Sequence, residues 1–104
     1  LLESFVKKIE SVGAGEILLT SIDAEGLQEG VDIDLYTKIE NLIDIPIIAS
    51  GGIGNLNHMI NFFDITNCSS VACGSLFVFY GKRNAVLVNY PTQKEIEFLM
   101  EKYE

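Results

Sequence analysis

This sequence contains no tryptophan and little of several other residue types, with two cysteines, two prolines and one histidine among 104 residues. Seven lysine and arginine residues against 15 aspartate and glutamate residues give a net charge of −8. That balance argues against nucleic-acid or anionic-membrane surfaces, which need clustered positive charge. No apolar run approaches the roughly 20 residues of a membrane span, so we expect no membrane segment. Two cysteines form no disulfide framework, so we expect a cytoplasmic setting.

The scarcity of histidine and cysteine also bears on metal binding. His58 is the only histidine and lies in a predicted helix, where a surface or packing role is more common than catalysis. The spacing of Cys68 and Cys73 matches no zinc motif, and Cys73 is interpreted as a small apolar filler in a strand. We therefore expect neither a metal site nor a cofactor.

The apolar share is large, since 48% of the residues are hydrophobic, which is typical of one folded domain. The chain begins Leu1-Leu2-Glu3, without an initiator methionine, and its first residues already follow a helical period. We therefore expect residues 1–104 to be a single partial domain, a fragment of a longer chain.

Hydrophobic periodicity predicts alternating helices and strands. Apolar residues recur at helical spacing in four segments, 1–12, 32–43, 55–63 and 92–103, with expected N-terminal caps at Asp32, Asn55 and Thr92. Short continuous apolar runs at 16–21, 47–50 and 70–74 predict strands covered on both faces. Residues 76–80 predict a short helix ending at Gly81, and 85–90 could form an extra strand. The alternation predicts a parallel α/β sheet, and three strands are under half of an eight-stranded (βα)₈ barrel.

The loops that follow the three predicted strands hold most of the candidate site. They contain Gly26, the pair Gly51 and Gly52, and Gly74 followed by Ser75. Glycine lets a backbone approach a ligand closely, and N–H groups that open a helix bind anions without a cationic side chain. The alternative is that these glycines only make tight turns. Because two such loops occur in the order typical of a barrel's phosphate site, we favour phosphate binding.

Two segments carry a specific resemblance. GEILLTSIDAEGLQEG (15–30) and PIIASGGIG (46–54) resemble the cyclase subunit of imidazole glycerol phosphate synthase over residues 1 to about 80. The resemblance implies a (βα)₈ TIM barrel, of which this chain would be the C-terminal part, strands six to eight and helices five to eight. The tail, 74–91, is more similar to a paralogue found with sugar-amidating genes of surface-polysaccharide pathways.

The resemblance also implies a reaction. The family adds ammonia, supplied by a glutaminase subunit, to a bisphosphorylated ribulosyl-formimino-aminoimidazole carboxamide ribotide, which it then cleaves and cyclises. Two aspartates at the ends of strands one and five act as general acid and base. Both positions precede Leu1, so the resemblance implies no catalytic residue in this chain and no activity by itself.

The resemblance further implies which residues contact the substrate. They are the phosphate-binding Gly26, Gly51, Gly52, Gly74 and Ser75 and the substrate-lining Thr20, Asp23, Glu25 and Ser50. The loop sequence DAEG departs from the family's DRDG, since Ala24 replaces an arginine and Glu25 an aspartate. Asp23 could orient substrate or cap its own loop, and the two roles are equally compatible with the sequence.

Two readings outside catalysis remain open from the residues alone. One is a non-catalytic phosphosugar-binding module that associates with an amidotransferase. The other is a half-barrel whose only activity is self-association. A partial barrel leaves two unpaired strand edges, so we expect a dimer or larger oligomer that covers them.

Overall fold

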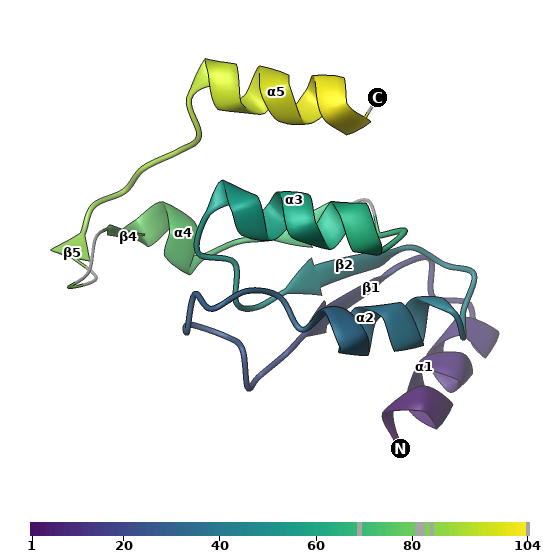
Figure 1. The fold of residues 1–104 in the computed structure, drawn as a ribbon. Helices are drawn as coiled ribbons and strands as arrows, with labels where there is room; N and C mark the ends of the chain where they lie inside the picture. Colours follow the sequence, from purple (N-terminus) through teal and green to yellow (C-terminus); the bar gives the residue numbers. More distant parts are fainter. Residues whose placement is uncertain (69, 81–82, 84, 104) are drawn as a thin grey trace.

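A three-stranded parallel sheet with helices along one face organises the computed structural model, which describes residues 1–68, 70–80, 83 and 85–103 (Figure 1). The elements in chain order are α1 (Leu2–Ser11), β1 (Ile17–Thr20), α2 (Ile33–Glu40), β2 (Ile47–Ser50), α3 (Leu56–Ile65), β3 (Ser70–Ala72), α4 (Ser75–Val78), β4 (Phe79–Tyr80), β5 (Ala85–Val86) and α5 (Gln93–Tyr103). The predicted parallel α/β sheet is confirmed.

The strands lie in the order β1-β2-β3, so each strand pairs with its neighbour in the sequence. Ile17 is opposite Ile47 and Thr20 is opposite Ser50 in the first pair, and Ser50 is opposite Ala72 in the second. The three strands therefore end together. The loops that follow them emerge at one edge of the sheet, on the side where α4 lies (Figure 1).

Only one face of this sheet is covered. Ile17, Ile47 and Ala49 point into a core that also contains Val6, Tyr36, Ile39, Ile43, Phe62 and Cys68. The alternate strand residues form the open face, defined here as Leu18, Thr20, Ile48, Ser50, Ser70 and Ala72, and none of them is buried. The expectation that the strands are covered on both faces is wrong for the chain as it stands, because all the helices that reach the core pack on the same side.

The helices begin at the predicted caps. The Asp32 side chain accepts a hydrogen bond from the N–H of Leu35 at 3.2 Å, and Asn55 accepts one from the N–H of His58 at 3.0 Å. Before α5, Thr92 and Glu95 form a reciprocal pair of backbone-to-side-chain hydrogen bonds, at 2.6 and 3.3 Å. Each side chain satisfies an N–H that the helix itself leaves without a partner.

The third βα unit differs from the prediction. The strand ends at Ala72 instead of Gly74, and the helix over 76–80 is reduced to the four residues of α4. Phe79–Tyr80 is instead β4, which pairs antiparallel with β5. The predicted stop at Gly81 lies outside the described residues. A short apolar run such as residues 76–80 is compatible with a helix or a strand. Its last two residues form a strand because they pair with β5.

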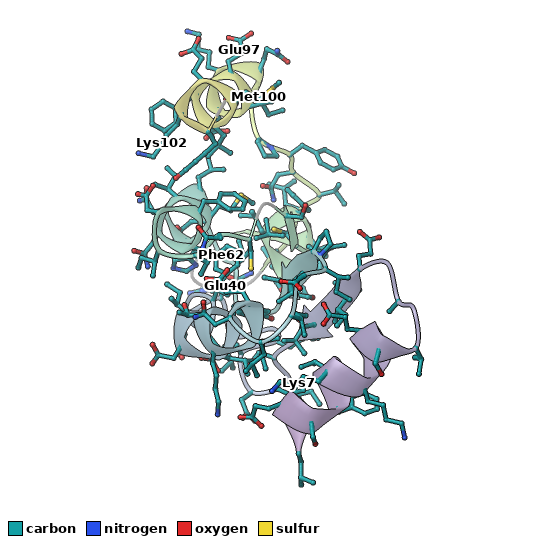
Figure 2. The ribbon with its side chains drawn as sticks, turned by 90° about the vertical axis from the view of Figure 1, so that its right-hand side faces the viewer. Lys7, Glu40, Phe62, Glu97, Met100 and Lys102 are labelled. Carbon is teal, nitrogen blue, oxygen red and sulfur yellow. The ribbon has the colours of Figure 1, made fainter. Side chains whose placement is uncertain are left out.

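Helix α5 lies beside α3 and far from the sheet (Figure 1). The Tyr103 hydroxyl donates to the Ile60 carbonyl oxygen or the Asp64 carboxylate, at 3.1 and 2.9 Å, and its ring packs edge-on to Phe63. Figure 2, along the helices, shows α5, α3 and α2 in a row, with Phe62 between α3 and α2. Met100, on α5, is 56% exposed, so this helix contributes little to the core.

Candidate phosphate-binding site

A small hollow lies where the strands end, and it brings together the loops that the sequence singled out. Its lining residues are Glu25, Gly26, Gln28, Gly51, Gly52, Ile53, Ala72, Cys73, Gly74 and Ser75. All five predicted phosphate-binding residues are among them. The loops after β1, β2 and β3 each contribute, because the strands are parallel and in register.

Gly51 and Gly52 have positive φ angles of 106° and 93°. A Cβ on Gly51 would lie 2.8 Å from the Ser21 carbonyl oxygen, and one on Gly52 would lie 2.0 Å from the Gly30 carbonyl oxygen. Both positions therefore require glycine in order to fold, whatever they bind. The tight-turn explanation accounts for this pair.

Gly74 has no such structural requirement. Its φ of −116° suits any residue, and a Cβ built there would meet no atom within 4 Å. Gly26 also has open space around its Cβ position, although its φ of 80° favours glycine. The fold therefore does not require glycine at position 74, in contrast to positions 51 and 52.

The backbone N–H groups at the hollow provide its binding capacity. Within the described part of the chain, the N–H groups of Gly51, Gly52 and Gly74 donate to no backbone or side-chain acceptor. Gly30 and Gly54, in the flanking turns, do have partners, the Gly52 carbonyl oxygen at 2.8 Å and Nδ1 of His58 at 3.0 Å. Backbone N–H groups that lack a partner in the folded chain are available to hold an anion.

The charge at the hollow opposes an anion. Among the described residues that line it, Glu25 carries the one carboxylate, with Oε2 3.3 Å from the Cβ position of Gly51, and there is no lysine or arginine. Burial raises the pKa of the Cys73 thiol, so this side chain stays neutral near pH 7. From these described residues an anion could receive hydrogen bonds from backbone N–H groups and from the Ser75 and Gln28 side chains, against the charge of Glu25.

The remaining predicted site residues lie apart from the hollow. Thr20 and Ser50 face each other on the open face, at the ends of β1 and β2. Asp23 is exposed in a separate shallow pocket with Glu29, and its carboxylate accepts no hydrogen bond from the described residues. The structure thus shows neither a capping role for Asp23 nor a position in the hollow. Glu25 alone of the four substrate-lining residues reaches the hollow.

His58 holds one of the site loops in place. Its Nδ1 accepts the hydrogen bond from Gly54, and Asn55 lies 3.3 Å from its Nε2. The contact is with a loop at the flank of the Gly51-Gly52 turn, which differs from the expected surface or helix-packing role.

Sequence reasoning missed Tyr36, which is fully buried. Its hydroxyl lies 2.5 Å from the Leu19 carbonyl oxygen and 2.9 Å from the Ser50 carbonyl oxygen, and it accepts the Ser50 N–H at 3.2 Å. Burial raises the pKa of this phenol above its usual value. Its place one turn before Ile39 on the apolar stripe of α2 could have revealed it.

Comparison with known proteins agrees with this geometry. The sequence pattern of a family described as histidine biosynthesis protein matches residues 1–84. The chain belongs to this family. Its fold is a TIM barrel, which explains why the present sheet is parallel and why the helices lie on one side of it.

Individual relatives in the family are similar over most of this chain. A protein of Pseudomonas aeruginosa, provisionally named imidazole glycerol phosphate synthase subunit hisF2, is 43% identical over 93 residues, 89% of this chain. A provisionally named HisF subunit of Leptospira borgpetersenii is 46% identical over 99 residues, 93% of the chain. The HisF subunit of Methanopyrus kandleri is 48% identical over 79 residues, 76% of the chain.

The chain spans only part of these relatives. The matches cover 37%, 39% and 29% of the three proteins, in the same order. The resemblance of LLTSID and PIIASGG to the cyclase subunit is confirmed. Among the described residues, no helix is long and apolar enough to cross a membrane.

Proposed function

We propose that this chain is the C-terminal part of a (βα)₈ cyclase subunit of imidazole glycerol phosphate synthase and holds one of its phosphate-binding sites. The observation that carries the proposal is the meeting of Gly26, Gly51, Gly52, Gly74 and Ser75 around one hollow. The element order supports it, since α1 precedes three βα units in sequence order. The open face would be the inner wall of the barrel, where Thr20 and Ser50 would line the substrate cavity.

The proposed reaction needs groups beyond these residues. The substrate is a bisphosphorylated ribotide, ammonia comes from a glutaminase subunit, and the general acid and base would be aspartates on strands preceding Leu1. The residues of this chain would bind one phosphate and orient that end of the substrate.

A second candidate is the paralogue that amidates sugars in surface-polysaccharide pathways. What supports it is the similarity of the tail, residues 74–91, to that paralogue.

A chimera tests the enzymatic proposal. The 104 residues would replace the matched segment of the M. kandleri subunit, and ammonia-dependent turnover of the ribotide would be measured. We expect turnover within about tenfold of the parent, because the chimera would contain the three strand ends and the glycine loops that follow them. Two matched variants of the chimera, Gly74→Ala at the hollow and Gly15→Ala away from it, separate binding from folding.

Loss of turnover in the Gly74→Ala chimera alone would support the assignment. A folded chimera that binds its glutaminase but never turns over ribotide would contradict it. Growth of a histidine auxotroph on the chimera is a second readout of the same turnover.

A further inference from the structure

The Tyr36 hydroxyl lies between the ends of β1 and β2. It accepts the Ser50 N–H at 3.2 Å and can donate to the Leu19 carbonyl oxygen at 2.5 Å or the Ser50 carbonyl oxygen at 2.9 Å. The side chain comes from α2, crosses the core and packs edge-on to Phe62, with ring centroids 5.6 Å apart. One helix thus holds two strands by their backbone near their C-terminal ends, at Leu19 of β1 and Ser50 of β2.

These contacts stand directly before the hollow. Ser50 is followed by Gly51, and the Ser50 carbonyl oxygen also accepts the Ser21 N–H at 3.0 Å. The Ser21 carbonyl oxygen in turn accepts the N–H of Glu25 at 2.9 Å and lies 2.8 Å from the Cβ position of Gly51. Hydrogen bonds therefore link the phenol, through Ser50 and Ser21, to the loop that carries Gly26, and Ser50 is bonded covalently to Gly51.

We infer that Tyr36 is a positioning residue for the phosphate site, fixing through Ser50 and Ser21 the distance between the Gly51-Gly52 turn and the loop that carries Gly26. The inference rests on the proposed function. Anion binding by backbone N–H groups depends on their relative positions, and the described residues that line the hollow include no lysine or arginine to compensate for a displaced loop.

The hydroxyl of Tyr36, and not its ring, makes the contacts with the strand ends. The aromatic ring alone would fill the core, but a phenol oxygen in an apolar interior is costly unless it is hydrogen-bonded. The buried Tyr36 makes those bonds to the strand backbone. Removing only the oxygen keeps the packing against Phe62 and releases the strand ends.

The test compares Tyr36→Phe with Val6→Ala in the 104-residue chain. Val6 is 2% exposed on α1, so its truncation leaves a core cavity but touches neither loop. Inorganic phosphate would be titrated while the amide signals of Gly51, Gly52 and Gly74 are followed by NMR, and stability would be measured in urea. We expect Tyr36→Phe to raise the phosphate Kd about fivefold and Val6→Ala to lower stability with an unchanged Kd.

The outcomes separate the phosphate site from the positioning role of Tyr36. Binding to wild type with the same Kd in Tyr36→Phe overturns the positioning role and leaves the phosphate site standing. A wild-type chain whose loop amides do not respond to phosphate overturns the proposed site and the role of Tyr36 in it. Should Tyr36→Phe fail to fold, hydrogen exchange of the Ser50 amide in wild type decides: phosphate should slow it, and no slowing overturns the positioning role.

Discussion

Gly30 donates its backbone N–H to the carbonyl oxygen of Gly52 at 2.8 Å, while a Cβ on Gly52 would lie 2.0 Å from the Gly30 carbonyl oxygen. The loop after β1 and the turn after β2 are thus in backbone contact, which only glycine at position 52 permits. Gly52 also lines the hollow, so the proposed site and the packing of the two loops share this residue.

Gly52→Ala should be strongly destabilising. The added methyl group clashes with backbone, and its φ of 93° is unfavourable for alanine, so we expect a loss of about 3 kcal/mol in the free energy of unfolding. Gly15→Ala is the control, because its Cβ position is open. Urea denaturation measures both. Equal stabilities for the two variants would show that the loops do not pack as described.

Glu25→Gln should tighten phosphate binding. The carboxylate lies at the hollow beside Gly51, and removing its charge while keeping its shape removes a repulsion. We expect the phosphate Kd to fall about threefold to tenfold at low ionic strength, and less at high salt. Glu29→Gln, in the separate pocket of Asp23, is the matched control. Weaker binding by Glu25→Gln would mean that the carboxylate organises the loop and does not repel the ligand.

The open face should drive self-association. Leu18 is 60% exposed beside Ile48, and both edges of the sheet are unpaired among the described strands. We expect light scattering at micromolar concentration to give a dimer or larger oligomer, and Leu18→Lys to give a monomer. Val12→Lys, a 76% exposed position outside the sheet, should leave association unchanged. A monomeric wild-type chain would contradict the expectation.

Cys68 should make stability fall in alkaline solution. Burial, with Glu40 close to the thiol, raises the pKa of Cys68 from 9.0 to about 11. The folded state thus holds this proton more tightly than the unfolded chain. The thiol's contribution to the free energy of unfolding is therefore full below pH 9 and is lost as the pH rises toward 11. In Cys68→Ala, the urea midpoint should depend less on pH between 9 and 11. An equally steep dependence in the variant would assign the effect to other groups.

The sequence was sufficient for the elements whose local signals agree. Asp32 and Asn55 could be predicted as caps, because each has a side-chain oxygen and stands directly before an apolar helical stripe. The glycine loops could be predicted to meet, since parallel strands in register end at one edge. That argument needed only the spacing of the strands.

Other features depend on contacts between distant residues. No local pattern shows that the Tyr36 hydroxyl reaches Ser50 or that Phe79 pairs with Val86 in place of continuing a helix. Asp23 was ambiguous for the same reason, because its sequence neighbours permit several loop directions. Both faces of the sheet were expected to be covered, because continuous apolar strands are typical of the complete barrels of this family. In this chain one face stays open.

The central claim is that backbone N–H groups at the strand ends bind a phosphate group. The most direct measurement is a titration of the ¹⁵N-labelled chain with ribose 5-phosphate, comparing wild type with Gly74→Ala. We predict saturable shifts of the Gly51, Gly52, Gly74 and Ser75 amides in wild type, and affinity at least about tenfold weaker in the variant at equal stability. Saturable shifts that are unchanged in Gly74→Ala, or no shift at these four amides, would contradict the claim.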